Sequence, residues 1–128
     1  MKKMLVAGVA IWLGASIALR LAGQYLLDTS AIGIAALAIL SAPVMFLLPR
    51  RLFGAYGIQP EAFGRAVVAL VVPGMLLDAV AATWFQVAYP NMRADAAGVF
   101  GGWLLFCNAM ALVGAITAPG SPQTRRIP

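Results

Sequence analysis

Four apolar stretches of about 20 residues each make up most of this sequence, and they restrict its fold more than any other feature. An α-helix rises about 1.5 Å per residue, so each stretch is long enough to cross a hydrocarbon core of about 30 Å. Of the 128 residues, 62% are hydrophobic and only 10% are charged, which is outside the range of soluble globular domains. The sequence therefore predicts an all-α integral membrane protein.

The apolar stretches predict transmembrane helices at residues 4–27, 31–53, 62–88 and 96–118. The connections between them are short, so residues 1–118 are expected to form a single four-helix transmembrane bundle. The segment 119–128 contains three prolines and shows no apolar periodicity. We expect this segment to be a disordered cytoplasmic tail.

The basic residues are distributed unevenly between the two ends of the predicted helices. Seven of the nine fall on one side, namely Lys2, Lys3, Arg50, Arg51, Arg65, Arg125 and Arg126. Because lysine and arginine accumulate in cytoplasmic connections, both termini are predicted to lie in the cytoplasm, with the protein in the inner (plasma) membrane. The net charge of +5 follows this pattern, so we expect the bilayer as partner, together with other membrane proteins or a second copy, and no nucleic acid.

The contents of cysteine and histidine exclude several kinds of site. The single cysteine, Cys107, cannot form an intramolecular disulfide or support paired-thiol chemistry. There is no histidine, so neither a metal site nor a haem cofactor is expected. We also find no nucleotide-binding loop and no nucleophile placed near a base. No catalytic residue is therefore assigned, and the chain is not expected to be an enzyme.

Two opposite charges lie inside the predicted helices, Arg20 in the first and Asp78 in the third. Such a residue costs about 2.5 to 3.5 kcal/mol at a helix centre, so it is expected to have a partner or a function. Counted from the predicted helix starts, each charge lies about 24 Å along its helix. We therefore predict an intramembrane ion pair between Arg20 and Asp78. Gln24 or Asn108 could complete its hydrogen bonds.

The charged pair has two interpretations. The first is a structural lock that determines how the first and third helices associate. The second is a small oligomeric transporter or channel in which Asp78 binds a proton or a cation. Helix kinks are predicted at Pro43 and at Pro73 and Gly74, and interrupted helices beside an intramembrane carboxylate are typical of transporters. An arginine partner would keep Asp78 ionised, which favours the structural lock.

Small residues recur every four positions in the first predicted helix, at Ala10, Gly14, Ala18 and Ala22. Because small side chains allow two helices to approach closely, we expect a neighbouring helix to pack against this stripe.

Five short segments carry a resemblance to a known family, namely residues 11–13, 19–21, 23–25, 73–79 and 100–105. They resemble an uncharacterised bacterial domain-of-unknown-function family of small four-span integral membrane proteins. The resemblance covers residues 4 to 115, and Arg20, Asp78 and Trp103 occupy its polar and aromatic positions. It implies the four-span fold but no activity. The sequence thus predicts a structural, accessory or interaction protein stabilised by the pair of Arg20 and Asp78.

Overall fold

The computed structural model describes residues 1–27 and 29–122, and these residues form helices and no strands. The predicted all-α fold is therefore confirmed. The long helices are α1 (Lys2–Leu26), α2 (Ala31–Ala55), α3 (Phe63–Thr83) and α5 (Ala97–Ile116). Three short elements complete the fold: η1 (Pro60–Ala62), α4 (Phe85–Ala88) and η2 (Ala94–Ala96). The described residues contain 4 helical segments that are long and apolar enough to cross a membrane.

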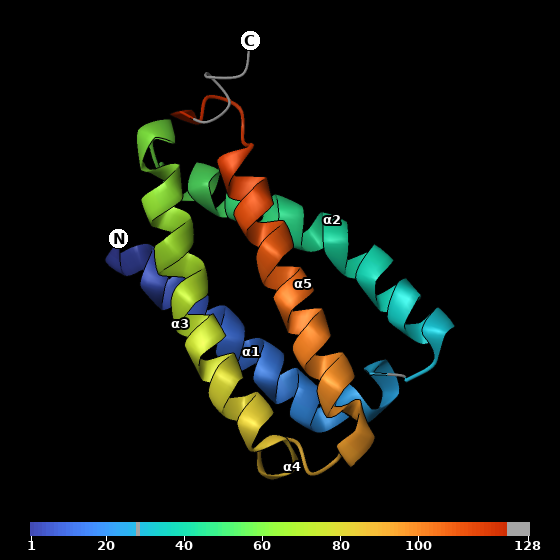
Figure 1. Cartoon of the computed structure of the whole chain (residues 1–128). Coiled ribbons are helices and arrows are strands. Elements are labelled where there is room, and N and C mark those ends of the chain that lie inside the picture. The colour runs from blue at the N-terminus through green and yellow to red at the C-terminus, as the bar shows by residue number, and fades with distance from the viewer. Residues whose placement is uncertain (28, 123–128) are drawn as a thin grey trace.

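The long helices pack in an order that differs from their order in the sequence. α1 packs mainly on α3, α3 on α5, and α5 on α2 (Figure 1). The consecutive helices α1 and α2 diverge from their connection and scarcely touch. The start of α1, the connection from α2 to α3 and the end of α5 lie at the same end of the molecule (Figure 1). That this end faces the cytoplasm stays a prediction.

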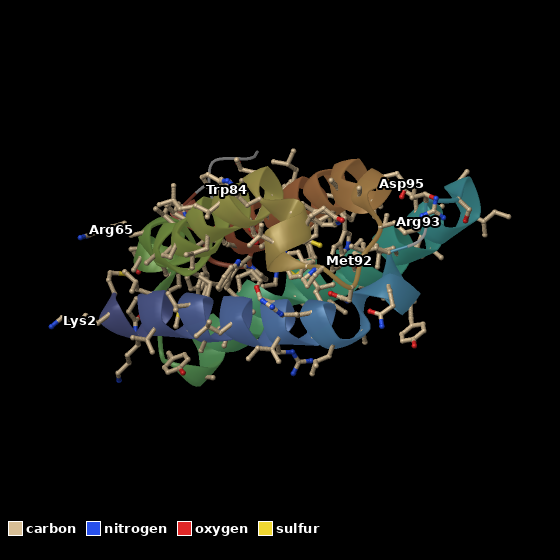
Figure 2. The ribbon with its side chains drawn as sticks, turned by 90° about the horizontal axis from the view of Figure 1, so that it is seen from below. Lys2, Arg65, Trp84, Met92, Arg93 and Asp95 are labelled. Atoms are coloured by element: carbon tan, nitrogen blue, oxygen red, sulfur yellow. The ribbon has the colours of Figure 1, made fainter. Side chains whose placement is uncertain are left out.

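Charged residues mark the two ends of the molecule. Lys2 and Arg65 project from one end, whereas Arg93 and Asp95 lie at the other (Figure 2). Arg93 and Asp95 form an exposed ion pair with a distance of 2.7 Å between Nη2 and Oδ2. We refer to the end that carries Lys2 and Arg65 as the basic end.

Two glycines allow the helix pairs to approach closely. A Cβ atom at Gly8 of α1 would collide with the backbone carbonyl of Leu70 in α3. A Cβ atom at Gly114 of α5 would collide in the same way with the carbonyl of Phe46 in α2. Both positions therefore require the absence of a side chain, because the two backbones are in direct contact.

The stripe of small residues on α1 does not pack as predicted. Its members are exposed, and no atom outside the helix lies within 4 Å of a Cβ built at Gly14. The buried positions of α1 are Met4, Gly8, Leu19 and Gly23, on a different face of the helix. No helix in the described part of the chain covers the stripe, and packing against a helix of another molecule stays a prediction.

The helix boundaries follow local signals in most places. Ser30 caps α2, because its hydroxyl accepts a hydrogen bond of 3.0 Å from the backbone N–H of Gly33. The chain stays helical through Pro43 and Pro73, which lie inside α2 and α3. The third predicted helix is wrong at its end, since the helix breaks at Trp84 (φ −110, ψ 49) and resumes as the short α4.

The segment predicted to be a disordered tail is partly described. Ser121 is fully buried, and its hydroxyl donates a hydrogen bond of 2.6 Å to the carbonyl of Ile116. Residues 119–122 therefore fold back against the end of α5, unlike the disordered segment that was predicted. The remaining predicted tail, 123–128, lies outside the described residues.

Two apolar clusters form the core at different depths. The cluster nearer the basic end contains Met4, Phe53, Ala66, Val67, Leu70, Val71, Ala111 and Ala115. The cluster nearer the other end contains Leu19, Leu27, Leu37, Ala81, Phe85, Tyr89, Met92, Ala96 and Phe100. In each long helix, mostly exposed or half-buried residues lie between the parts that belong to the two clusters, and polar side chains occur among them.

Candidate functional site

A polar layer separates the two apolar clusters. It consists of Trp12, Ser41, Asp78, Trp103, Cys107 and Asn108, and each long helix supplies at least one of them. Unpaired polar groups are costly at this depth, so such a layer is stable only when its members bind one another.

Asp78 of α3 lies at the centre of one half of the layer. The indole Nε1–H of Trp12 in α1 donates a hydrogen bond of 2.8 Å to Oδ1 of Asp78. The side chain of Asn108 in α5 lies beside this carboxyl group. The amide nitrogen of Asn108 in addition donates a bond of 2.9 Å to the carbonyl of Leu104 within its own helix. The carboxyl group of Asp78 therefore links α3 to α1 through a hydrogen bond and lies next to α5.

The other half of the layer joins α2 to α5. The indole Nε1–H of Trp103 donates a hydrogen bond of 2.9 Å to the hydroxyl of Ser41. The thiol of Cys107, which is buried, lies beside the same serine. Cys107 and Asn108 are adjacent in the chain, so α5 contributes to both halves of the layer.

The structure does not form the predicted ion pair between Arg20 and Asp78. Arg20 is exposed, and none of the described residues provides its guanidinium with a hydrogen bond or an ion pair. Leu19, the preceding residue, is buried. Because successive helix residues are rotated by about 100°, Arg20 is turned away from the face that packs on α3. Asp78 instead accepts its hydrogen bond from Trp12.

The axial alignment of α1 and α3 explains why Arg20 does not reach Asp78. Gly8 lies against Leu70, and Trp12 lies against Gly74, at 3.7 Å from a Cβ built there. A residue of α1 is thus level with the α3 residue whose number is 62 higher, which places Ser16 level with Asp78. The prediction put Arg20 at that level, one helical turn or about 6 Å too far along α1.

The two predicted supporting residues are placed differently. Asn108 lies beside Asp78, as described above. Gln24 instead lies at the end opposite the basic end, where its side-chain oxygen accepts a bond of 2.6 Å from Asn91. Asn91 also donates a bond of 2.9 Å to the carbonyl of Leu19, so this contact fastens the connection before α5 to α1.

Sequence reasoning missed Trp12, Ser41 and Trp103 as members of the polar layer. Tryptophan and serine are common in membrane helices. The free-energy cost of placing either residue in the membrane is too small to single it out as a functional candidate. Trp12 follows Met4 and Gly8 at intervals of four residues, which places it on the same face as these buried positions. That spacing was the available signal.

The layer contains a carboxyl group and only neutral donors. Among the residues that the structure describes, no cationic side chain bonds to Asp78, and no group of three or more metal-ligating side chains occurs. An isolated charge is costly in a medium of low dielectric, so a proton or a cationic ligand could neutralise such a carboxylate. The arrangement can therefore hold helices together, and it can also bind a small cation.

One comparison with known proteins gives a match. The model of the family described as "Family of unknown function (DUF5367)" matches residues 25–120. This range contains Asp78 and most of the polar layer, whereas Trp12 and Arg20 precede it. No curated protein and no solved structure matches the chain.

Proposed function

We propose that this chain, which belongs to the DUF5367 family of unknown function, is a multi-pass inner-membrane protein that acts as a structural, accessory or interaction protein rather than as an enzyme. The polar layer supports a structural role for Asp78, because its carboxyl group accepts a hydrogen bond from α1 and lies beside Asn108 of α5. The function would then depend on surfaces that the protein offers to its neighbours in the membrane.

The exposure of α2 is the observation that carries this proposal. α2 packs mainly on α5, and only Leu37, Pro49 and Phe53 of its residues are buried. Its outward face is apolar and includes Ile32 and Ile39, which are 84% and 71% exposed. A helix that contacts essentially one neighbour leaves a wide apolar surface for lipid, for another membrane protein or for a second copy of the chain.

Photo-crosslinking in native membranes tests the interaction role. A photoreactive residue at Ile39 is expected to give a discrete protein adduct, because this position faces outward. The same residue at Leu37, which is 8% exposed and lies two positions earlier, is the matched control and should give none. If Ile39 is crosslinked to lipid alone, the interaction role is wrong.

A small oligomeric transporter or channel is the second candidate, and the surroundings of Asp78 favour it. The main argument against this function was that an arginine would hold the carboxylate in permanent charge. Arg20 does not reach Asp78, so the carboxyl group is free of that restriction. Asp78 would then bind a proton or a cation as part of the transport cycle.

Flux measurements separate the two candidates. Purified protein in proteoliposomes is compared with the Asp78→Asn variant for a panel of cations and cationic drugs. A transporter requires wild-type flux above that of the variant, because the amide cannot carry the negative charge. Equal flux at the background level for the whole panel would remove the transporter candidate.

A further inference from the structure

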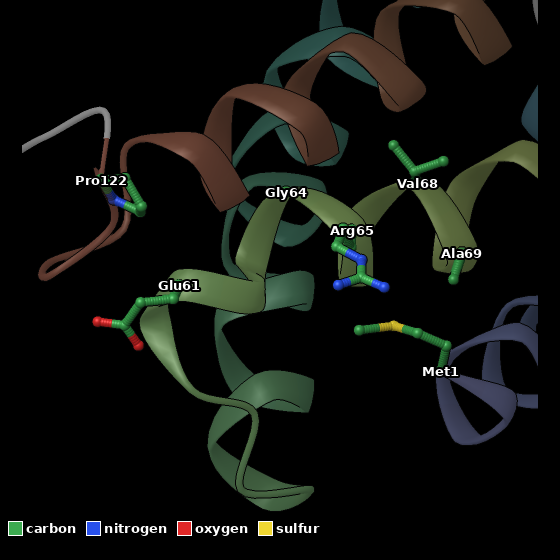
Figure 3. Close-up of a pocket in the computed structure, with 7 residues that line it drawn as sticks. All are labelled: Met1, Glu61, Gly64, Arg65, Val68, Ala69 and Pro122. Atoms are coloured by element: carbon green, nitrogen blue, oxygen red, sulfur yellow. The ribbon is translucent and has the colours of Figure 1, made fainter.

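We infer that a cavity at the basic end binds the headgroup of an anionic phospholipid. The cavity has a volume of ≈ 530 Å³ and lies between the start of α1 and the first turns of α3. Met1, Glu61, Arg65, Val68 and Ala69 line it (Figure 3). It is separate from the polar layer, so the inference does not depend on the function of Asp78.

The position of the cavity places it where headgroups lie. The segments that can span the membrane begin at Lys2 and at Pro60, so the cavity adjoins the starts of two membrane spans. Arg65 is located five residues after Pro60, about 8 Å along the helix. Its side chain points toward the basic end, in the same direction as that of Lys2 (Figure 2). A long basic side chain directed this way reaches the polar surface of the bilayer.

The charges around the cavity fit a phosphate group. Arg65 is exposed, and none of the described residues engages its guanidinium in an ion pair or a hydrogen bond. A guanidinium presents several N–H groups in a plane, which suits two phosphate oxygens at once. Glu61 also lines the cavity, but its carboxylate points away from Arg65 (Figure 3). Lys2 and Lys3 add two exposed positive charges nearby, so positive charge predominates over the single carboxylate.

The remaining lining fits the body of a lipid. Val68 is 52% exposed and lies one turn beyond Arg65, on the side of the bilayer interior. Met1 and Ala69 extend this apolar surface, and the side chain of Met1 lies opposite the Arg65 guanidinium (Figure 3). A basic group above an apolar wall is the arrangement that holds a headgroup together with the start of its acyl chains. Free phosphate would use only the basic part.

Native mass spectrometry of the full chain in detergent tests the inference. Phosphatidylglycerol, phosphatidylethanolamine and phosphatidylcholine with identical acyl chains are compared at equal concentration. We expect phosphatidylglycerol to bind most tightly and Arg65→Gln to weaken its binding about tenfold, because a charge-assisted hydrogen bond is lost. Arg51→Gln is the matched control: Arg51 is exposed near the end of α2 and does not line the cavity. This control removes the same charge and should preserve binding.

A second variant tests the cavity itself without changing the charge. Val68→Trp fills the apolar wall at an exposed position, so it is expected to fold normally and to weaken the binding of phosphatidylglycerol. Inorganic phosphate at the same concentration should not displace the lipid. The inference is overturned if Arg51→Gln is as harmful as Arg65→Gln, if the zwitterionic lipids bind as tightly, or if phosphate displaces phosphatidylglycerol.

Discussion

At the scale of single residues, Asp78 is an ionisable group that lies inside a membrane-spanning helix. An unpaired carboxylate at the centre of a membrane helix is costly by about 2.5 to 3.5 kcal/mol. The indole of Trp12 offsets part of this cost through a hydrogen bond from α1, and the amide of Asn108 in α5 lies beside the carboxyl group. Arg20 lies near the end of α1 and is exposed, so its long side chain can reach polar headgroups directly.

The hydrogen bond of Trp12 leads to the first prediction. Trp12→Phe keeps most of the aromatic volume but removes the donor to Asp78. We expect it to lower the free energy of unfolding in detergent by about 1 to 2 kcal/mol. Arg20→Gln, which removes a charge from an exposed position, should change it by less than about 0.5 kcal/mol. Thermal or denaturant unfolding of both purified variants measures this difference.

The result of this comparison also discriminates between the two partners of Asp78. A large effect of Arg20→Gln together with a small effect of Trp12→Phe would support the ion pair that the structure lacks. The opposite order agrees with the contacts described above.

At the scale of helices, two backbone crossings hold the molecule together. Gly8 lies against Leu70 where α1 meets α3, and Gly114 lies against Phe46 where α5 meets α2. Next to the second crossing, the Nε–H of Arg50 in α2 donates a bond of 2.8 Å to the carbonyl of Gly114. The same guanidinium lies 4.3 Å from the ring centroid of Phe46, which adds a cation–π contact. The helix pairs α1–α3 and α2–α5 are thus each held together near the basic end.

The second prediction compares two glycines of α1. Gly8→Leu introduces a side chain where the backbone of α3 leaves no room, so we expect a loss of about 1 to 3 kcal/mol in stability. Gly14→Leu makes the same change in the same helix, at a position that is open for at least 4 Å, and should be tolerated. Unfolding in detergent measures both variants, and equal losses would show that the crossing at Gly8 is wrong.

At the scale of the whole molecule, the distribution of charge between the two ends predicts an orientation in the membrane. The basic end carries Lys2 and Arg65, while the other end carries the ion pair of Arg93 and Asp95. Since lysine and arginine favour the cytoplasmic side, we expect the basic end to face the cytoplasm.

Cysteine labelling provides the third prediction, which concerns this orientation. In intact spheroplasts a membrane-impermeant maleimide should label Arg93→Cys, whereas it should label Lys3→Cys only after permeabilisation. The native Cys107 is buried and should give little background. The reverse pattern of labelling would invert the assigned topology.

Local sequence signals predicted the long helices but not all of their ends or all of the site residues. The predicted range 31–53 agrees with α2 within two residues, because an apolar stretch preceded by a capping serine defines both its length and its start. The third predicted helix was too long. The apolar pattern continues past Trp84, so the pattern gave no sign that the helix breaks there. Of the candidate site, Asp78 and Asn108 lie together in the polar layer, whereas Arg20 and Gln24 lie elsewhere.

The sequence by itself determined the fold class, the number of long apolar helices and the importance of Asp78. All three follow from the free-energy cost of placing polar groups in hydrocarbon. That cost can be judged from the residues of each segment without knowing its neighbours. Only the tertiary structure decided the partner of Asp78. That choice depends on which faces of α1 and α3 meet and on their axial offset, and both are set by the backbone contact at Gly8. A displacement of one helical turn places Ser16 instead of Arg20 level with Asp78, and the carboxyl group accepts its hydrogen bond from Trp12, one turn earlier in α1.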